Sequence, residues 1–209
     1  LFPTVASAAG ASTGEQVATK GSSAGAPPCS SCHGPEGQGQ PAAGFPRISG
    51  MDAKYLARQL AGFAAGTRAN PVMSPIAKLL TPSEASKVAA YYAAIPAVKQ
   101  AGEAPAKPAP SEGMRLAVKG DWNIGLPACA QCHGPQGLGV GSSFPPLAGQ
   151  SSAYLATQLA AFKAGTRKDD PLGLMQGIAK RLGDTQARAV SEFYAALPVV
   201  AGSPSKGKP

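Results

Sequence analysis

The sequence predicts an all-α protein in which one helical domain is present twice. Three observations support this prediction. Apolar residues recur at helical spacing and nowhere alternate as they do in strands, helix start and stop signals are present, and long stretches of the first half return about 100 residues later. The 209 residues contain no apolar run of 18, so we expect no transmembrane helix.

The first clear helix is the one that precedes Gly66. Leu56, Leu60 and Phe63 fall on one face of it, which is the spacing of an amphipathic helix. Glycine adopts the left-handed conformation that ends many helices. We therefore expect Gly66, and Gly165 in the second half, to be helix C-caps.

A second helix is predicted from the capping box Thr81–Glu84, in which proline occupies the first turn. Pro96 cannot continue a helix and is expected to end this one. The second half repeats the arrangement from about Asp184 to Pro198. Each half therefore ends in a helix of similar length.

The two halves match closely enough to indicate a duplicated domain. YLARQLAGFAAGTR at 55–68 and YLATQLAAFKAGTR at 154–167 agree at 11 of 14 positions. A period of 100 residues is too long for a solenoid. The expected organisation is an N-terminal extension at 1–19, a first domain at 20–96, a linker at 97–113, a second domain at 114–198 and a C-terminal tail at 199–209.

The composition leaves these small domains short of apolar side chains. Leu, Ile, Val and Phe make up 36 of the 209 residues, a share that often accompanies disorder when net charge is high. Charged residues are only 14% of this chain, so charge repulsion does not hold it open. We therefore expect a group other than amino-acid side chains to fill part of the core.

The cysteines and histidines identify that group. All four cysteines and both histidines of the chain belong to two CxxCH motifs, the attachment signature of c-type haem. The cysteines would form thioethers with the haem vinyl groups, and the histidine would bind the iron. The predicted cofactors are two covalently bound haem c groups. The residues assigned to them are Cys29, Cys32 and His33 in the first half and Cys129, Cys132 and His133 in the second.

Two other interpretations of these motifs are weaker. A structural zinc site needs four ligands, whereas each half offers two cysteines and one histidine. A redox-active CxxC pair does not require a histidine at the same offset twice.

Methionine is the expected sixth iron ligand. Aligning Pro71–Lys78 with Pro171–Lys180 places Met73 opposite Met175. Thioether ligation favours ferrous iron and raises the reduction potential. We interpret the two other methionines, Met51 and Met114, as packing residues.

Further matched residues are candidates for contacts around the haem. The carbonyls of Pro46 and Pro145 could orient the ligand imidazoles, although both prolines also suit simple rigid turns. The arginines after each Gly-Thr pair could bind haem propionates or cap helix ends. Tyrosines in the repeated helix would pack with their polar tips toward the haem edge. These residues are Arg68, Arg167, Tyr55 and Tyr154, and Trp122, which has no counterpart, is expected to pack.

Taken together, these motifs resemble the dihaem cytochromes c4. The resemblance covers both halves and rests on the CxxCHG motifs, on FPPLAGQ at 144–150 and on the repeated helix that ends in Ala-Gly-Thr-Arg. It implies two class I cytochrome c domains related by a pseudo-two-fold axis, with the haems close together. It also implies electron transfer in the periplasm, commonly toward a terminal oxidase.

Two functions remain open. The first is a periplasmic electron carrier between a respiratory donor and a terminal oxidase or other acceptor. The second is a dihaem subunit dedicated to a sulfide, sulfur-compound or alcohol dehydrogenase. Neither gives the chain an enzymatic activity or a small-molecule substrate of its own. A dihaem peroxidase is a poorer third interpretation, because it needs an open iron position.

The net charge of +8 favours redox partners with an acidic docking face and is compatible with loose attachment to an anionic membrane surface. The basic residues are scattered along the chain, so we expect no nucleic-acid binding.

Overall fold

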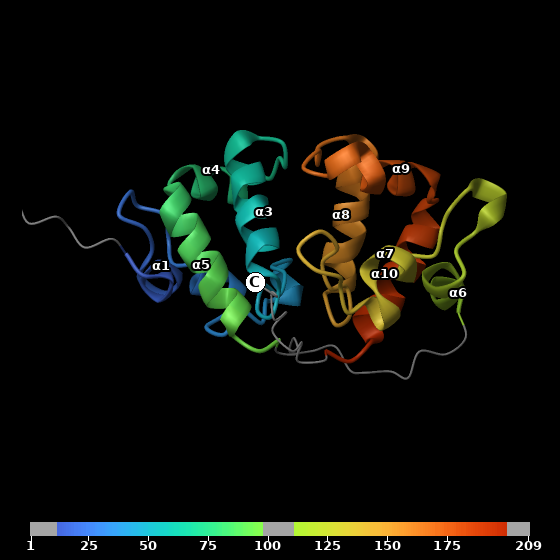
Figure 1. Ribbon diagram of the computed structural model, residues 1–209, viewed down its shortest axis with the longest axis horizontal. Coiled ribbons are helices and arrows are strands. Elements are labelled where there is room, and N and C mark those ends of the chain that lie inside the picture. The colour runs from blue at the N-terminus through green and yellow to red at the C-terminus, as the bar shows by residue number, and fades with distance from the viewer. Residues whose placement is uncertain (1–11, 98–110, 200–209) are drawn as a thin grey trace, which may run out of the picture.

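The computed structural model describes residues 12–97 and 111–199, which form two helical halves side by side (Figure 1). The first half contains α1 (Gly14–Lys20), α2 (Ser30–His33), α3 (Ala53–Ala65), α4 (Met73–Lys78) and α5 (Pro82–Ala94). The second half contains α6 (Glu112–Val118), α7 (Ala130–His133), α8 (Ser152–Ala164), α9 (Leu174–Arg181) and α10 (Asp184–Ala196).

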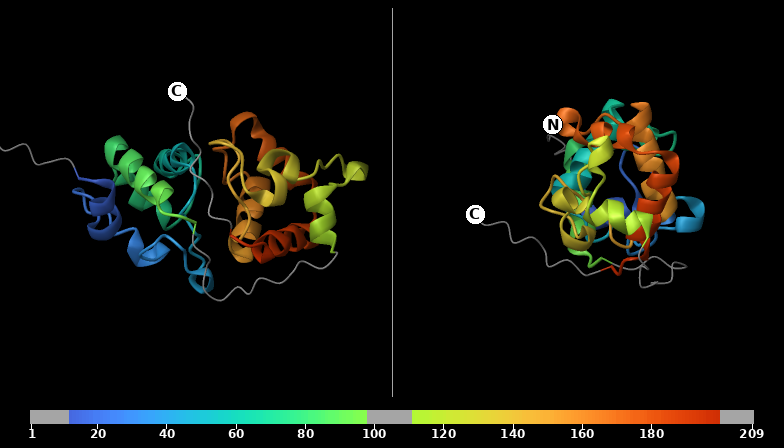
Figure 2. Two further views of the ribbon diagram at one scale, coloured as in Figure 1. Left: turned by 60° about the horizontal axis from the view of Figure 1, so that its bottom comes forward. Right: turned by 90° about the vertical axis from the view of Figure 1, so that its right-hand side faces the viewer.

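The predicted fold class is confirmed. Within the described ranges the chain has helices, short 3-10 turns and isolated β-bridges, and no strand. None of the helices in these ranges has the length and apolar character needed to span a membrane. The halves are seen apart in the left view of Figure 2, and α3 and α8 face each other between them in Figure 1.

The predicted helix signals form the expected caps. Gly66 ends α3 with a φ of 77°, and Gly165 ends α8 with a φ of 71°. Both angles lie in the left-handed region that glycine enters without strain. The Thr81 side chain accepts a hydrogen bond from the Glu84 backbone N–H, and the Glu84 carboxylate accepts one from the Thr81 backbone N–H, so the capping box of α5 is complete.

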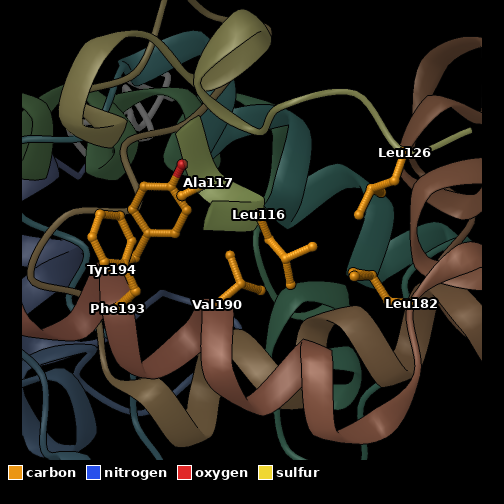
Figure 3. Close-up of a cluster of buried hydrophobic side chains, with 7 residues drawn as sticks. All are labelled: Leu116, Ala117, Leu126, Leu182, Val190, Phe193 and Tyr194. Carbon is orange, nitrogen blue, oxygen red and sulfur yellow. The ribbon is translucent and has the colours of Figure 1, made fainter. Parts of the chain in front are cut away.

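The last helix of each half organises a small core. In the first half, α5 packs against α1 and α3, and a buried cluster contains Val17, Ala18, Val88 and Tyr92. In the second half, α10 packs against α6 and α8 around the cluster drawn in Figure 3. That cluster contains Leu116, Ala117, Leu126, Leu182, Val190, Phe193 and Tyr194.

The first helix of each half begins earlier than the domain starts expected from the sequence. Helix α1 lies almost wholly within 1–19, yet Val17 and Ala18 belong to the core. Two equivalent glycines explain its close packing. A Cβ at Gly14 would lie 2.2 Å from the carbonyl oxygen of Lys87, and one at Gly113 would lie 2.1 Å from that of Ala189. The rest of the expected extension, linker and tail (1–11, 98–110 and 200–209) lies outside the described residues.

Two packing predictions were wrong. Trp122 is 71% exposed and Met114 is 39% exposed. Trp122 begins a 3-10 turn (Trp122–Ile124), and the buried residue that anchors this loop is Leu126, which is fully buried. Met51, in contrast, is 7% exposed, as expected for a packing residue.

A candidate haem site in each half

The imidazole of each CxxCH motif is held by a proline carbonyl. The short helix α2 ends at His33, whose Nδ1 lies 2.9 Å from the carbonyl oxygen of Pro46. His133 at the end of α7 has the same contact with Pro145, also at 2.9 Å. Because a carbonyl only accepts hydrogen bonds, Nδ1 carries the proton and Nε2 is left as the electron-pair donor.

Burial sets the protonation states at both motifs. Desolvation lowers the pKa values of His33 and His133, which are 7% and 6% exposed. Desolvation also raises the pKa values of Cys29 and Cys129 to about 11. Both imidazoles are therefore neutral at pH 7, which is the form that binds a metal.

A cavity of about 520 Å³ brings the candidate residues of the first half together. Both cysteines of the motif line it, together with His33, Met73 and Met51. The sequence alignment selected Met73 over Met51, and both side chains border this space. The wall also contains the candidate residues Pro46, Tyr55 and Arg68.

Side-chain oxygens position the helices that carry the candidate methionine ligands. Met73 begins α4, and its backbone N–H donates to Oδ1 of Asn70 at 2.8 Å. In the second half Asp170 has the equivalent role, since its Oδ2 accepts from the backbone N–H of Gln176 at 3.1 Å. Met175, one residue before Gln176, is half-buried in the first turn of α9.

The arginines expected at the haem propionates lie between the two halves. Arg68 donates to Oε1 of Gln59 at 2.9 Å, and across the interface to the hydroxyl of Tyr154 and Oε1 of Gln158, both at 2.7 Å. The Arg68 guanidinium therefore bonds to side chains of both halves and does not act as a helix cap.

Arg167 forms the reciprocal set of contacts. It donates to Oε1 of Gln158 at 3.0 Å, and across the interface to Oε1 of Gln59 at 2.7 Å and the hydroxyl of Tyr55 at 3.3 Å. Antiparallel backbone bonds join the same segments, from Ala69 N to Thr166 O at 2.9 Å and from Lys168 N to Thr67 O at 2.6 Å. Equivalent residues thus meet around the pseudo-two-fold axis.

One arginine at this interface was missed by the sequence analysis. Arg47 is 1% exposed and has proline as its counterpart in the second half. Its guanidinium donates to the carbonyl oxygens of Ser49 at 2.9 Å and Ala148 at 3.0 Å. Gln150 bonds to the Arg47 backbone in both directions. The signal that the sequence offered was the change from FPR at 45–47 to FPP at 144–146 in the repeat.

The charges around the cavity fit a haem. Arg47 and Arg68 have no carboxylate within ion-pair distance in the described residues, whereas Arg167 pairs with Asp169 at 3.0 Å. Nε of Arg47 has no hydrogen-bond partner in the same ranges. Buried cations need counter-charges, and the carboxylates of haem propionates would supply them. No group of three or more His, Cys, Asp or Glu within 12–97 and 111–199 is arranged to hold a metal ion.

Comparison with known proteins identifies the class. The sequence matches the cytochrome c family over residues 12–95 and 98–197, so each half corresponds to one cytochrome c domain. The chain belongs to the cytochrome c family.

Several relatives match most of the chain, across both halves. Cytochrome c4 of Thiocapsa roseopersicina is 40% identical over 172 residues, which cover 81% of this chain and 86% of the relative. The thiosulfate dehydrogenase electron acceptor of Thiomonas intermedia is 47% identical over 187 residues, which cover 88% of this chain and 85% of the relative. The predicted resemblance to dihaem cytochromes c4 is confirmed.

Solved structures agree with this assignment. Reduced cytochrome c4 from Pseudomonas stutzeri superposes with a TM-score of 0.72 at 31% identity, covering 81% of this chain and 93% of that one. The thiosulfate dehydrogenase TsdBA from Marichromatium purpuratum gives 0.83 at 41% identity, covering 89% of this chain but only 40% of that longer one. The protein is a dihaem c-type cytochrome with two covalently bound haem c groups, and it functions in electron transfer.

Proposed function

We propose that this protein accepts electrons from a dehydrogenase that oxidises thiosulfate and passes them to a further acceptor. The observation that carries the proposal is the ranking of the relatives. Two thiosulfate dehydrogenase electron acceptors are 46% and 47% identical over 88% of the chain, whereas four cytochromes c4 are 31% to 40% identical over 81%. This corresponds to the sulfur-compound alternative of the sequence analysis.

In this proposal each half holds one haem through the same set of residues. The cysteines of each motif form the thioethers, and His33 and His133 bind iron through Nε2. Their Nδ1–carbonyl bonds of 2.9 Å to Pro46 and Pro145 support that role, because they fix the ring and its tautomer. Met73 and Met175 complete the coordination, and the haem supplies a one-electron couple at each iron.

The residues between the halves hold the two haems in one unit. Arg68 and Arg167 bind propionates from positions where each guanidinium already contacts both halves. Tyr55 and Tyr154 accept bonds from these arginines and orient them. The chain therefore needs no substrate site of its own, and we propose no enzymatic activity for it.

We place this function in the periplasm, where cytochromes c4 operate. The net charge of +8 supports docking to partner proteins with an acidic face, and loose attachment to an anionic membrane would follow from the same charge. Both kinds of contact would weaken as salt screens the surface.

The second candidate is the respiratory carrier of the sequence analysis, which takes electrons from a respiratory donor and delivers them to a terminal oxidase. The relatives named cytochrome c4 favour it, since they match 81% of the chain at up to 40% identity. The two candidates differ in the donor, so the donor is what an experiment must vary.

Stopped-flow reduction of the ferric protein separates these candidates. We expect rapid uptake of one electron per haem when a thiosulfate dehydrogenase and thiosulfate are supplied together, and none with thiosulfate alone. A quinol-oxidising complex with quinol is the competing donor. Faster reduction by that complex than by the dehydrogenase would favour the respiratory carrier and contradict our proposal.

A further inference from the structure

Large apolar side chains are exposed on α6 and on the turn that follows it. Trp122 is 71% exposed and Val118 is 55% exposed. Met114 and Ile124 are each 39% exposed. Met114 and Val118 lie four residues apart on α6 and therefore share one face of it. The other two belong to the 3-10 turn after α6, and we call the four residues the Trp122 patch.

The first half has no such patch, although its chain follows an equivalent path. Gly14 and Gly113 pack in the same way against the last helix of their halves and align the two segments. The equivalent residues of the first half are polar or small, namely Glu15, Thr19 and the turn SSA at 22–24. The patch is therefore not needed for the haem-binding fold that the halves share.

The turn that contains Trp122 projects from the second half on the side away from the first half. The yellow-green segment after α6 extends outward there in Figure 1 and in the left view of Figure 2. The backbone N–H groups at its tip have partners within the turn. Ile124 and Gly125 donate to the carbonyls of Asp121 and Trp122, both at 3.2 Å, and Asn123 donates to Oδ1 of Asp121 at 3.2 Å. Donors that already have partners can leave water at little cost, so this turn suits a layer with few hydrogen-bond acceptors.

Two exposed cations flank the patch. Lys119 lies between Val118 and the turn. Arg181 reaches the turn from α9, since a Cβ at Gly125 would lie 3.5 Å from its Nε. Neither cation forms an ion pair within 12–97 and 111–199. Both are therefore available to anionic groups outside the protein.

The acids next to the patch are already paired. Arg115 binds Glu112 at 2.8 Å and Asp121 at 3.0 Å, and the second pair holds the turn against α6. With Lys119 and Arg181, these three cations and two acids leave a net charge of +1 around the patch. Exposed apolar side chains are thus combined with a positive surround.

We propose that the Trp122 patch binds the surface of a membrane that contains anionic lipids. Tryptophan is enriched where apolar and aqueous layers meet, and flanking cations are attracted to anionic headgroups. An acidic partner protein is the other possible occupant, but a projecting turn offers it little matching area. The inference rests on the part of the proposed function that gives the protein loose membrane attachment, and it holds for either donor.

Co-sedimentation of the whole dihaem protein with sucrose-loaded vesicles, measured by haem absorbance, tests the apolar part of the patch. Vesicles of equal parts phosphatidylglycerol and phosphatidylcholine should bind the protein at low ionic strength. Trp122→Ser should lower this partition about tenfold, because burial of one large apolar side chain contributes at least that factor. Since Trp122 is exposed, the variant should fold normally.

Leu172→Asn is the matched control for the loss of apolar surface. Leu172 is 94% exposed in the 3-10 turn before α9, and its φ of 64° is one that asparagine tolerates. This variant should bind vesicles as the unmodified protein does.

A second pair of variants tests the charge. Lys119→Gln should weaken binding to the anionic vesicles about fivefold, the usual contribution of one cation near such a surface, and should not change the weaker binding to phosphatidylcholine alone. Lys20→Gln removes the equivalent charge at the end of α1, where the patch is missing, and should leave binding to both kinds of vesicle unchanged.

Three results would overturn the proposal: no binding of the unmodified protein to the anionic vesicles, undiminished binding of Trp122→Ser, or an equal loss in Leu172→Asn. Reduction by the dehydrogenase and thiosulfate without vesicles is the further readout, and Trp122→Ser should react as fast as the unmodified protein. Slower reduction of this variant would assign the patch to a protein partner and would also overturn the proposal. If the dehydrogenase reduces neither protein, the proposed donor is wrong, and the vesicle measurements still decide the inference.

Discussion

The two halves of the chain agree at the haem motifs and differ in what surrounds them. Both imidazoles lie 2.9 Å from a proline carbonyl, and both long helices end at a left-handed glycine. The charged groups have diverged instead. In the first half Arg47 is buried with no ion-pair partner among the described residues, and Glu84 belongs to the N-terminal cap of α5. The second half has Pro146 and Gln186 at the equivalent positions. Duplication thus preserved the attachment geometry and left electrostatics free to change.

The largest effect should come from removing one pair of attachment cysteines. We expect Cys29→Ala combined with Cys32→Ala to lose one haem and to unfold the first half, because its small apolar core depends on the cofactor. The equivalent change at Cys129 and Cys132 should do the same to the second half. Haem content and thermal melting measure both effects. A first half that folds cooperatively without its haem would contradict the account.

Replacing a candidate methionine ligand should alter one haem site without unfolding the domain. Met73→Ala and Met175→Ala should each abolish one sulfur-to-iron charge-transfer band and lower the potential of that haem. Met51→Ala is the sharpest control, because Met51 borders the same cavity as Met73. Loss of the band in Met51→Ala with retention in Met73→Ala would show that the alignment chose the wrong sulfur. Met114→Ala should change neither site.

Truncating the interface arginines should destabilise the protein to unequal degrees. Arg68→Ala leaves the hydroxyl of Tyr154 without the Arg68 donor and removes one of the two arginine donors to Oε1 of Gln59, at a cost of about 3 kcal/mol. Arg167→Ala should cost more, because it also strands the buried carboxylate of Asp169. Denaturant unfolding measures both free energies. Equal losses of unfolding free energy in the two variants would mean that the Arg167–Asp169 ion pair adds no stability of its own.

The smallest effect concerns the caps of α5 and α10. Hydrogen bonds from the backbone and side chain of Thr81, with weaker ones from Ser23, lower the pKa of Glu84. Its contribution is therefore complete above the unfolded-state pKa and is lost as pH falls through the lower folded-state value. The equivalent residue of the second half, Gln186, does not titrate.

Glu84→Gln should thus lower the free energy of unfolding by about 1 kcal/mol near neutral pH, which is the usual contribution of a helix cap. The stability of the first half should then fall less steeply as the pH is lowered. Unfolding of the protein and of this variant, followed between pH 7 and acid conditions, checks the difference. If the first half loses stability at low pH as steeply in Glu84→Gln as in the unmodified protein, another carboxylate causes that loss.

Local signals predicted much of this molecule. The capping box at Thr81, the glycines that end α3 and α8, and the histidine contacts with Pro46 and Pro145 all follow from short stretches of sequence. Periodicity and motif spacing contain that information, because the interacting groups lie within one element or one loop.

Long-range contacts were the part that could not be predicted. Arg47 meets Ala148, 101 residues away, and Gln59 meets Arg167 at a separation of 108. No local sequence pattern indicates which residues meet across the interface. The alignment of the halves does not indicate them either, because it pairs each residue with its equivalent in the repeat and not with its contact partner. The exposure of Trp122 was missed for a different, local reason, because Leu126 is the residue of this loop that enters the core.

We propose that the interface between the halves holds the two haems in one electron-transfer unit. Transient reduction of one haem, followed as ionic strength increases, tests it most directly. The reciprocal contacts of Arg68 and Arg167 are buried and little screened, so the intramolecular step should stay constant while exchange with an acidic partner slows. An intramolecular step that slows in parallel with the exchange would contradict the claim and would describe two independent carriers joined by a linker.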